Sequence, residues 1–184
     1  MGKEIVVLTG SPRRKGNSDQ LADAFIRGAA EQGHTAHKFE AAHKNISGCR
    51  GCNMCWSFGT SPCVVQDDFY ELVPLLETCE VAVFVSPVYF WGFTAQLKAA
   101  WDRFYPYCKS EGRKRFAVKE SALLLTLGDT DDATWRHAAG TYRDVAEYSG
   151  WKDRGIIAAG GLRGKMDILK HEALGQAEAL GRAL

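Results

Sequence analysis

Short apolar runs alternate with stretches of helical periodicity along this chain, and that alternation limits the possible fold more than any other feature. Four apolar runs are typical of strands, a weaker alternating stretch at residues 35–39 is typical of an edge strand, and after most of them apolar residues recur every three or four positions. Strands that alternate with helices form parallel sheets with helices on both faces. The sequence therefore predicts an α/β fold, a doubly wound five-stranded parallel sheet in one domain over residues 1–184, with strands in the segments 4–9, 35–39, 81–85, 116–127 and 156–159.

The predicted helices have recognisable boundaries. The first begins near Ser18, with Asn17 or Ser18 as its N-cap, and ends at Gly33. Asp67 and Asp68 open the next one, where their carboxylates suit the positive end of the helix dipole. Two more helices are predicted at residues 97–108 and 132–148. A final one is expected to bury a stripe formed by Leu169, Ala173, Ala177, Leu180 and Leu184.

Charge and hydropathy exclude several classes of protein. The 23 basic and 22 acidic residues leave a net charge of +1, so the chain lacks the cationic field of a nucleic-acid-binding protein. The longest apolar stretch, residues 81–91, is interrupted by Ser86 and Pro87 and is too short to span a membrane. The run at residues 5–8 is too short for a signal peptide. We therefore expect a cytoplasmic protein with no membrane or nucleic-acid partner.

The first predicted strand leads into the loop Gly-Ser-Pro-Arg-Arg-Lys-Gly-Asn-Ser, residues 10–18. A loop between a strand and a helix offers an anion the free N–H groups of the helix N-terminus. Ser11, Asn17 and Ser18 add short hydrogen-bonding side chains, and Arg13 adds a positive charge. The loop has no P-loop lysine and no dinucleotide fingerprint, so it favours a phosphate monoester. The alternative is a polar turn with an N-cap.

The third predicted strand is followed by Ser-Pro-Val-Tyr-Phe-Trp-Gly, residues 86–92. Three adjacent aromatic side chains suit the face and edge of a heteroaromatic ring, although they could instead cover the core or a subunit interface. Residues 126–129 follow the fourth strand and can supply backbone groups to the same ring. Ligands of doubly wound sheets bind beyond the carboxyl ends of the strands. These segments therefore predict one ligand site.

Cysteine is concentrated in one 15-residue window, with the spacing Cys49-x2-Cys52-x2-Cys55-x7-Cys63. Without a signal peptide, such a cluster favours metal, iron–sulfur or redox chemistry over structural disulfides. A tight loop of thiolates can bind one metal ion or one iron–sulfur cluster. Packed thiols, a zinc site and a disulfide between Cys55 and Cys63 stay open as alternatives. Cys79 and Cys108 are expected to be small buried hydrophobes.

An Asp-Arg pair, a Gly-Gly turn and the histidines are each expected to have a structural role and no catalytic one. Asp102 and Arg103 are expected to form an ion pair at a helix surface. The segment Gly160-Gly161 with Arg163 is expected to be a turn that can border the ligand site. The five histidines show no paired metal-ligand spacing.

In order along the chain, the motifs are GSPRRKGNS, then CRGCNMC with Cys63 and the Asp-Asp pair, and then SPVYFWG with LKAAWDR. This order of the motifs resembles the NAD(P)H-dependent FMN reductase family, over roughly residues 4–130. The similarity is greatest to its iron–sulfur flavoprotein-like branch. It implies a flavodoxin-like fold with strand order 2-1-3-4-5, bound FMN and a homodimer or tetramer. It also implies the site residues. They are Ser11, Arg13, Asn17 and Ser18 for the phosphate, Pro87, Val88, Tyr89, Phe90, Trp91 and Gly92 for the flavin ring, and Thr126, Gly128 and Asp129 as further contacts.

The resemblance further implies a [4Fe–4S] cluster at Cys49, Cys52, Cys55 and Cys63, although related flavoproteins keep such cysteines without one. The predicted function is an oxidoreductase whose FMN takes a hydride from NADPH or NADH and passes electrons to a quinone, a flavin or another small acceptor. The alternative is a non-catalytic electron carrier or redox sensor that uses FMN with the cluster. A zinc-stabilised scaffold without flavin is a third possibility.

Overall fold

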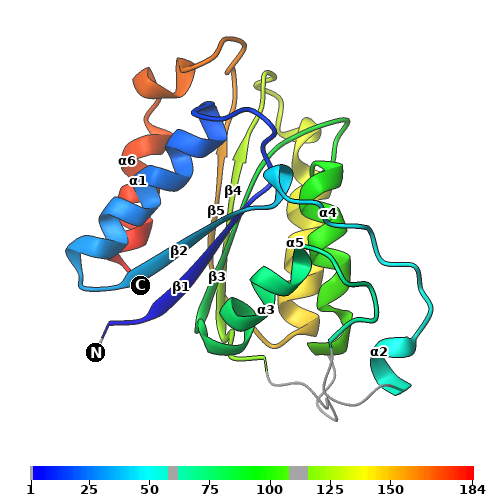
Figure 1. Ribbon diagram of the computed structural model, residues 1–184. Helices are drawn as coiled ribbons and strands as arrows, with labels where there is room; N and C mark the ends of the chain where they lie inside the picture. Colours follow the sequence, from blue (N-terminus) through cyan, green and yellow to red (C-terminus); the bar gives the residue numbers. More distant parts are fainter. Residues whose placement is uncertain (1, 58–61, 108–115) are drawn as a thin grey trace.

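The computed structural model describes residues 2–57, 62–107 and 116–184, so the expected burial of Cys108 lies outside the described residues. Its five strands form one sheet in the order β2-β1-β3-β4-β5, and every neighbouring pair is parallel. This arrangement, visible in Figure 1, confirms the predicted fold class and strand order. The strands are β1 (Glu4–Thr9), β2 (Thr35–Glu40), β3 (Val81–Pro87), β4 (Glu120–Thr126) and β5 (Lys152–Ala159).

Helices cover both faces of the sheet. Helices α1 (Asn17–Glu31) and α6 (Ala173–Arg182) lie on one face, and α3 (Phe69–Thr78), α4 (Ala95–Trp101) and α5 (Arg136–Tyr148) lie on the other (Figure 1). A four-residue helix, α2 (Met54–Ser57), lies in the cysteine-bearing segment. The remaining helical segments are short 3₁₀ turns: η1 (Ala41–His43), η2 (Asp102–Tyr107), η3 (Asp132–Thr134) and η4 (Asp167–Lys170).

Two apolar layers hold the helices to the sheet. Along β1, Ile5 and Val7 pack toward α1 and α6, whereas Val6 and Leu8 pack toward α3, α4 and α5. Successive strand residues point to opposite faces, so a continuous apolar run is what a strand covered on both faces requires. In the second layer Phe84 of β3 stacks on Trp101, with ring centroids 4.4 Å apart.

Some predicted details were wrong. The N-cap of α1 is Gly16, so Asn17 and Ser18 lie inside the first turn rather than capping it. Leu169 is 53% exposed, because it lies in η4, outside α6; its neighbour Ile168 is buried in its place. Strand β5 begins at Lys152, four residues before the predicted start, where polar side chains at the sheet edge hide the apolar pattern.

Helices α1 and α6 approach each other closely at two glycines. A Cβ atom on Gly28 would lie 1.9 Å from the carbonyl oxygen of Glu178, and one on Gly181 would lie 2.2 Å from that of Phe25. Only glycine permits this backbone separation. In the part of the chain that the structure describes, no helix has the length and apolar character needed to cross a bilayer.

Candidate functional site

A hollow of about 130 Å³ lies at the carboxyl edge of the sheet, beyond the ends of β1, β3 and β4. We call it the carboxyl-edge hollow. It brings together most of the residues that the sequence predicted for a cofactor, although they come from three separate segments. Its lining consists of Ser11, Arg13, Asn17, Ser18, Pro87, Val88, Tyr89, Thr126, Leu127, Gly128 and Leu162.

The loop after β1 is fixed against α4. A Cβ atom on Gly10 would lie 2.5 Å from both the Thr94 Oγ1 and the Leu97 Cβ, so no larger residue fits without a shift. Thr94 donates its hydroxyl to the Gly10 carbonyl at 2.8 Å, and the Gly10 N–H donates to the Val85 carbonyl at 2.9 Å. The glycine thus lets the loop start close to the helix, and these bonds hold it there.

The polar end of the hollow carries backbone N–H groups and a guanidinium that face no carboxylate among the described residues. No side chain caps α1, so the N–H groups of its first turn are left to an external acceptor. Arg13 has no ion-pair partner within 4 Å among the described residues. The Ser11 hydroxyl accepts from the Arg13 N–H at 3.2 Å and donates to the Arg13 carbonyl at 3.4 Å. Uncapped N–H groups beside an unpaired guanidinium suit a phosphate.

Asn17 and Ser18 make contacts within the protein that sequence reasoning did not foresee. The Ser18 and Thr126 hydroxyls are 2.6 Å apart and buried, which joins the start of α1 to the end of β4. The Asn17 side chain donates to the Gly164 carbonyl at 3.0 Å and accepts from the Ile168 N–H at 3.3 Å. These bonds fasten the loop after β5 to α1, and this loop places Leu162 in the hollow.

Leu127 and Leu162 also line the hollow; Leu127 lies in the predicted segment 126–129, whereas Leu162 was not predicted. Leu127 directly follows the predicted contact Thr126 at the end of β4. For Leu162, the Gly160-Gly161 turn was the available signal, since it marks another strand end at the same edge. Gly161 has a φ of +75°, a conformation that favours glycine.

The apolar end of the hollow is held by β3. The Val88 N–H donates to the Thr126 carbonyl at 2.8 Å, which keeps Pro87, Val88 and Tyr89 beside the end of β4. Tyr89 and Gly92 then exchange two backbone hydrogen bonds of 3.0 Å and close a two-residue turn. Apolar side chains at this end of the hollow and donors at the other fit a phosphorylated ring compound such as FMN.

Phe90 and Trp91 form the tip of that turn and do not line the carboxyl-edge hollow. They are 94% and 51% exposed, and both have left-handed φ values, 48° and 63°. Trp91 and Gly92 instead line a neighbouring depression that also includes Phe93.

Asp129 also lies outside the carboxyl-edge hollow. Its carboxylate accepts hydrogen bonds from the Thr134 hydroxyl and from the N–H groups of Asp131 and Thr130. These bonds, that of Thr134 first, hold the Asp129 pKa below its usual value. The side chain is therefore occupied in the turn after β4.

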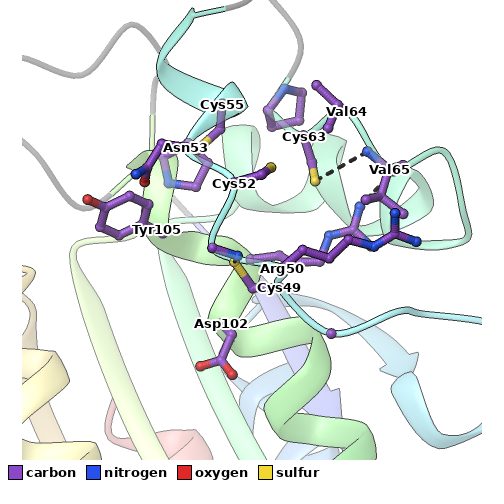
Figure 2. A pocket seen from close by; sticks show the side chains of 15 residues that line it. Cys49, Arg50, Cys52, Asn53, Cys55, Cys63, Val64, Val65, Asp102 and Tyr105 are labelled. Atoms are coloured by element: carbon purple, nitrogen blue, oxygen red, sulfur yellow. Dashed lines mark hydrogen bonds between the residues drawn. The ribbon is translucent and has the colours of Figure 1, made fainter.

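A second, larger hollow of about 370 Å³ lies beyond the other end of α4, and we call it the cysteine hollow. All four clustered cysteines line it, together with Arg103 and Tyr105 from η2 (Figure 2). Within the described residues no disulfide joins any two of the four, so the bond expected as an alternative between Cys55 and Cys63 is absent from this structure. Figure 1 shows α2 at the opposite end of the sheet from the carboxyl edge.

The thiols are near enough to influence one another. Burial raises the pKa of Cys55, and the charges of Cys63, Cys49 and Cys52 raise it further. Among the described residues, no group of three or more Cys, His, Asp or Glu side chains is placed to hold a metal ion. A [4Fe–4S] cluster takes four cysteine thiolates at its corners rather than around one ion, so this donor set fits a cluster in number and kind.

The expected surface ion pair between Asp102 and Arg103 was wrong. Asp102 pairs with Lys98 on the helix surface. Arg103 turns inward and pairs with Asp67, and these two side chains are 2% and 5% exposed. The Asp67 pKa is affected first by burial, which raises it, but the hydrogen bond from the Ser47 N–H and the Arg103 charge hold it below its usual value.

Comparisons with known proteins agree with this architecture. The chain is 37% identical over 104 residues to an iron–sulfur flavoprotein of Archaeoglobus fulgidus, which covers 56% of this chain and 46% of that relative. It is 24% identical over 183 residues to YwqN of Bacillus subtilis, provisionally named as an NAD(P)H-dependent FMN-containing oxidoreductase, with 96% of both chains covered. This chain thus spans about half the length of the Archaeoglobus iron–sulfur flavoprotein that it matches.

A solved structure shares the fold over almost the whole chain. An NAD(P)H:quinone oxidoreductase from Methanothermobacter marburgensis superposes with a TM-score of 0.78 at 21% identity, covering 99% of this chain and 96% of that one. The family model described as NADPH-dependent FMN reductase matches residues 4–139. That range contains all three predicted cofactor segments and the cysteine cluster, and the chain therefore belongs to the NADPH-dependent FMN reductase family.

Proposed function

We propose that this chain binds FMN in the carboxyl-edge hollow and acts as an NAD(P)H-dependent oxidoreductase that passes electrons to a small acceptor such as a quinone or a flavin. One observation carries the proposal. A single hollow collects phosphate-type donors after β1 and apolar groups after β3, β4 and β5. Family membership supports the same cofactor.

The residues after β1 would hold the phosphate. The uncapped N-terminus of α1 and the Arg13 guanidinium supply positive charge, and Ser18 supplies a hydroxyl. The Ser11 hydroxyl would exchange its 3.4 Å bond to the Arg13 carbonyl for one to the phosphate. Because Ser18 and Thr126 share one hydrogen bond, one of the two O–H groups stays available to a ligand. A dianionic monoester would thereby gain charge-assisted bonds without a P-loop lysine.

The residues after β3 would hold the ring. Bound FMN supplies the capacity to accept two electrons from a reduced nicotinamide and to release them to an acceptor. Val88 and Tyr89, fixed by the bond to Thr126, would orient the ring, and Leu162 would exclude water from one side. No side chain of the hollow needs to transfer a proton in this step.

Release of the flavin by heat, followed by chromatography, tests the cofactor. We expect FMN, and a chain that yields only FAD or that cannot be reconstituted with FMN would contradict the proposal. Anaerobic addition of NADPH, and separately of NADH, should bleach the flavin absorbance. Turnover is then measured with a quinone and with free FMN as acceptors.

A second candidate function is a non-catalytic electron carrier or redox sensor that uses FMN with a [4Fe–4S] cluster. It is supported by the four thiols that line the cysteine hollow and by the names of the iron–sulfur flavoprotein relatives. Anaerobic purification with iron, zinc and acid-labile sulfide analysis tests it. Stoichiometric iron and sulfide that are lost in a Cys52→Ser variant, while FMN stays bound, would support a cluster.

We further propose that the chain forms one domain and assembles as a homodimer or tetramer in the cytoplasm. The exposed Phe90 and Trp91 support an assembled state, because large apolar side chains on a protruding turn are unfavourable in water. Light scattering of the FMN-loaded protein measures the oligomeric state, and a monomer at micromolar concentration would contradict the assembly.

A further inference from the structure

We propose that Arg103 is the positioning residue of the cysteine hollow. Its guanidinium fastens both ends of the cysteine-bearing segment to η2, so that the four thiols line one hollow before any centre is bound. This inference deepens the second candidate function and does not depend on flavin binding or on the electron acceptor.

The two ends of the segment already lie side by side. The Asn45 N–H donates to the Asp68 carboxylate at 2.7 Å, and the Asp68 N–H donates back to the Asn45 carbonyl at 3.2 Å. Next to this pair, the Ser47 N–H donates to Asp67 Oδ2 at 2.9 Å. The cysteines lie between these two ends, beginning two residues after Ser47. The base of the segment is thus closed by backbone-to-carboxylate bonds.

Arg103 joins this base to the rest of the protein. Its Nη1 lies 2.6 and 2.7 Å from the two oxygens of Asp67 and 3.4 Å from the Ser47 carbonyl. Its Nη2 donates to the Val65 carbonyl at 2.8 Å, two residues after Cys63. One side chain therefore bonds to the chain both before Cys49 and after Cys63.

The contacts to Asp67 and to the Val65 carbonyl require the planar shape of an arginine side chain. The guanidinium lies over the Phe69 ring, 4.2 Å from its centroid, and carries its donors in a rigid planar fork. A lysine ammonium would keep the charge but could not bond to Asp67 and the Val65 carbonyl in the same geometry. A hydrophobic pair could fill the space with equal stability. The Asp67–Arg103 pair therefore serves to position the cysteine-bearing segment and not only to stabilise the fold.

One donor of Arg103 is left over. Its Nε is buried and has no hydrogen-bond partner among the described residues, although the side chain lines the cysteine hollow. An unpaired buried donor is unfavourable, and it is the group that a bound anionic sulfur would satisfy. Hydrogen bonds to sulfur are one of the means by which proteins adjust iron–sulfur centres.

The test measures alkylation of each cysteine in the FMN-loaded protein by peptide mass spectrometry. In the wild type we expect Cys55 and Cys63, which are half-buried, to react more slowly than the exposed Cys49 and Cys52. In Arg103→Lys the rates at Cys55 and Cys63 should rise by about tenfold, which corresponds to about 1.4 kcal/mol of easier local opening. Iron and sulfide uptake on anaerobic reconstitution should fall in parallel.

Two further variants separate positioning from general stability. Arg182→Met removes the exposed Arg182–Glu31 pair between α6 and α1, on the other face of the sheet, and should leave alkylation and iron uptake as in the wild type. The double variant Asp67→Asn with Arg103→Met leaves no uncompensated buried charge, so it should keep the melting temperature near that of the wild type. It should nevertheless expose Cys55 and Cys63.

The proposal would be overturned if the double variant restored wild-type alkylation rates, because the pair would then act on stability alone. Iron uptake that is the same in wild type and Arg103→Lys would overturn it as well. Fast alkylation of the buried Cys79 in Arg103→Lys would indicate general unfolding, in which case the double variant decides.

Discussion

Ser18 and Thr126 share a buried hydroxyl–hydroxyl hydrogen bond of 2.6 Å, although 108 positions separate them in the sequence. The bond connects the first turn of α1 with the last residue of β4, and both residues line the carboxyl-edge hollow. A ligand that binds to one hydroxyl therefore also acts on the other. The bond thus joins the polar end of the hollow to the end of β4.

Ser18→Ala should weaken FMN binding by roughly tenfold to hundredfold, because a hydrogen bond to a charged phosphate contributes about 1.5–3 kcal/mol. Titration of apoprotein with FMN measures this loss. The N-cap is Gly16, so a capping role for Ser18 cannot explain a loss of affinity.

Thr126→Val is the matched control for that variant. It removes the same shared bond, and both variants should lower the free energy of unfolding by about 0.5–1.5 kcal/mol. FMN affinity should fall less than in Ser18→Ala if Ser18 is the residue that contacts the phosphate. Equal affinity in wild type and Ser18→Ala would contradict a phosphate role.

Replacing Phe90-Trp91 with Asn-Gly should stabilise the protein. Two bulky residues with φ of 48° and 63° form the centre of a turn whose geometry favours Asn-Gly, and each left-handed residue costs on the order of 1–3 kcal/mol. We expect a higher melting temperature for monomeric protein and unchanged FMN affinity, since neither side chain lines the carboxyl-edge hollow. A lower melting temperature would show that the aromatic rings contribute more contact energy than the strain costs.

The strand-end segments could be located from the sequence for a simple geometric reason. Parallel strands bring their carboxyl ends to one edge, so Ser11, Pro87 and Thr126 had to lie near one another once the strands were recognised. Strand recognition was straightforward because β1, β3 and β4 are apolar on both faces.

Side-chain direction could not be predicted in the same way. Three adjacent aromatic residues after a strand, and the family resemblance, assign Phe90 and Trp91 to the ring site. In the structure these two residues have left-handed φ values and do not line the hollow. Arg103 was paired with its neighbour Asp102, whereas its partner, Asp67, lies 36 positions earlier and comes within reach only through the tertiary fold. The spacing of residues along the sequence predicts neither the direction of these aromatic side chains nor the ion-pair partner of Arg103.

Acid should destabilise the protein through Asp67. Its pKa in the folded state lies below the unfolded value of about 3.9, so its contribution to stability is complete above that pH and is lost as the pH falls through the folded pKa. Asp67→Asn should cost about 3–5 kcal/mol at pH 7, because it leaves Arg103 buried without a counter-charge.

Urea unfolding at pH 7 and pH 3 measures this dependence. The wild type should lose more stability between the two pH values than Asp67→Asn does, since the variant has no carboxyl group to protonate at this position. An equal loss in both proteins would assign the acid sensitivity to other carboxylates.

Helices α1 and α6 are in close contact at Gly28. Gly28→Ala should destabilise the protein by about 1–3 kcal/mol, because the new methyl group would meet the Glu178 backbone and force the helices apart. Gly175→Ala is the control within α6: nothing lies within 4 Å of the position that its methyl group would take, so the lower helix propensity of glycine alone applies and stability should rise by about 0.5–1 kcal/mol. Urea unfolding of both variants decides between close packing and helix propensity, and a gain of stability in both would show that the two helices can separate without cost.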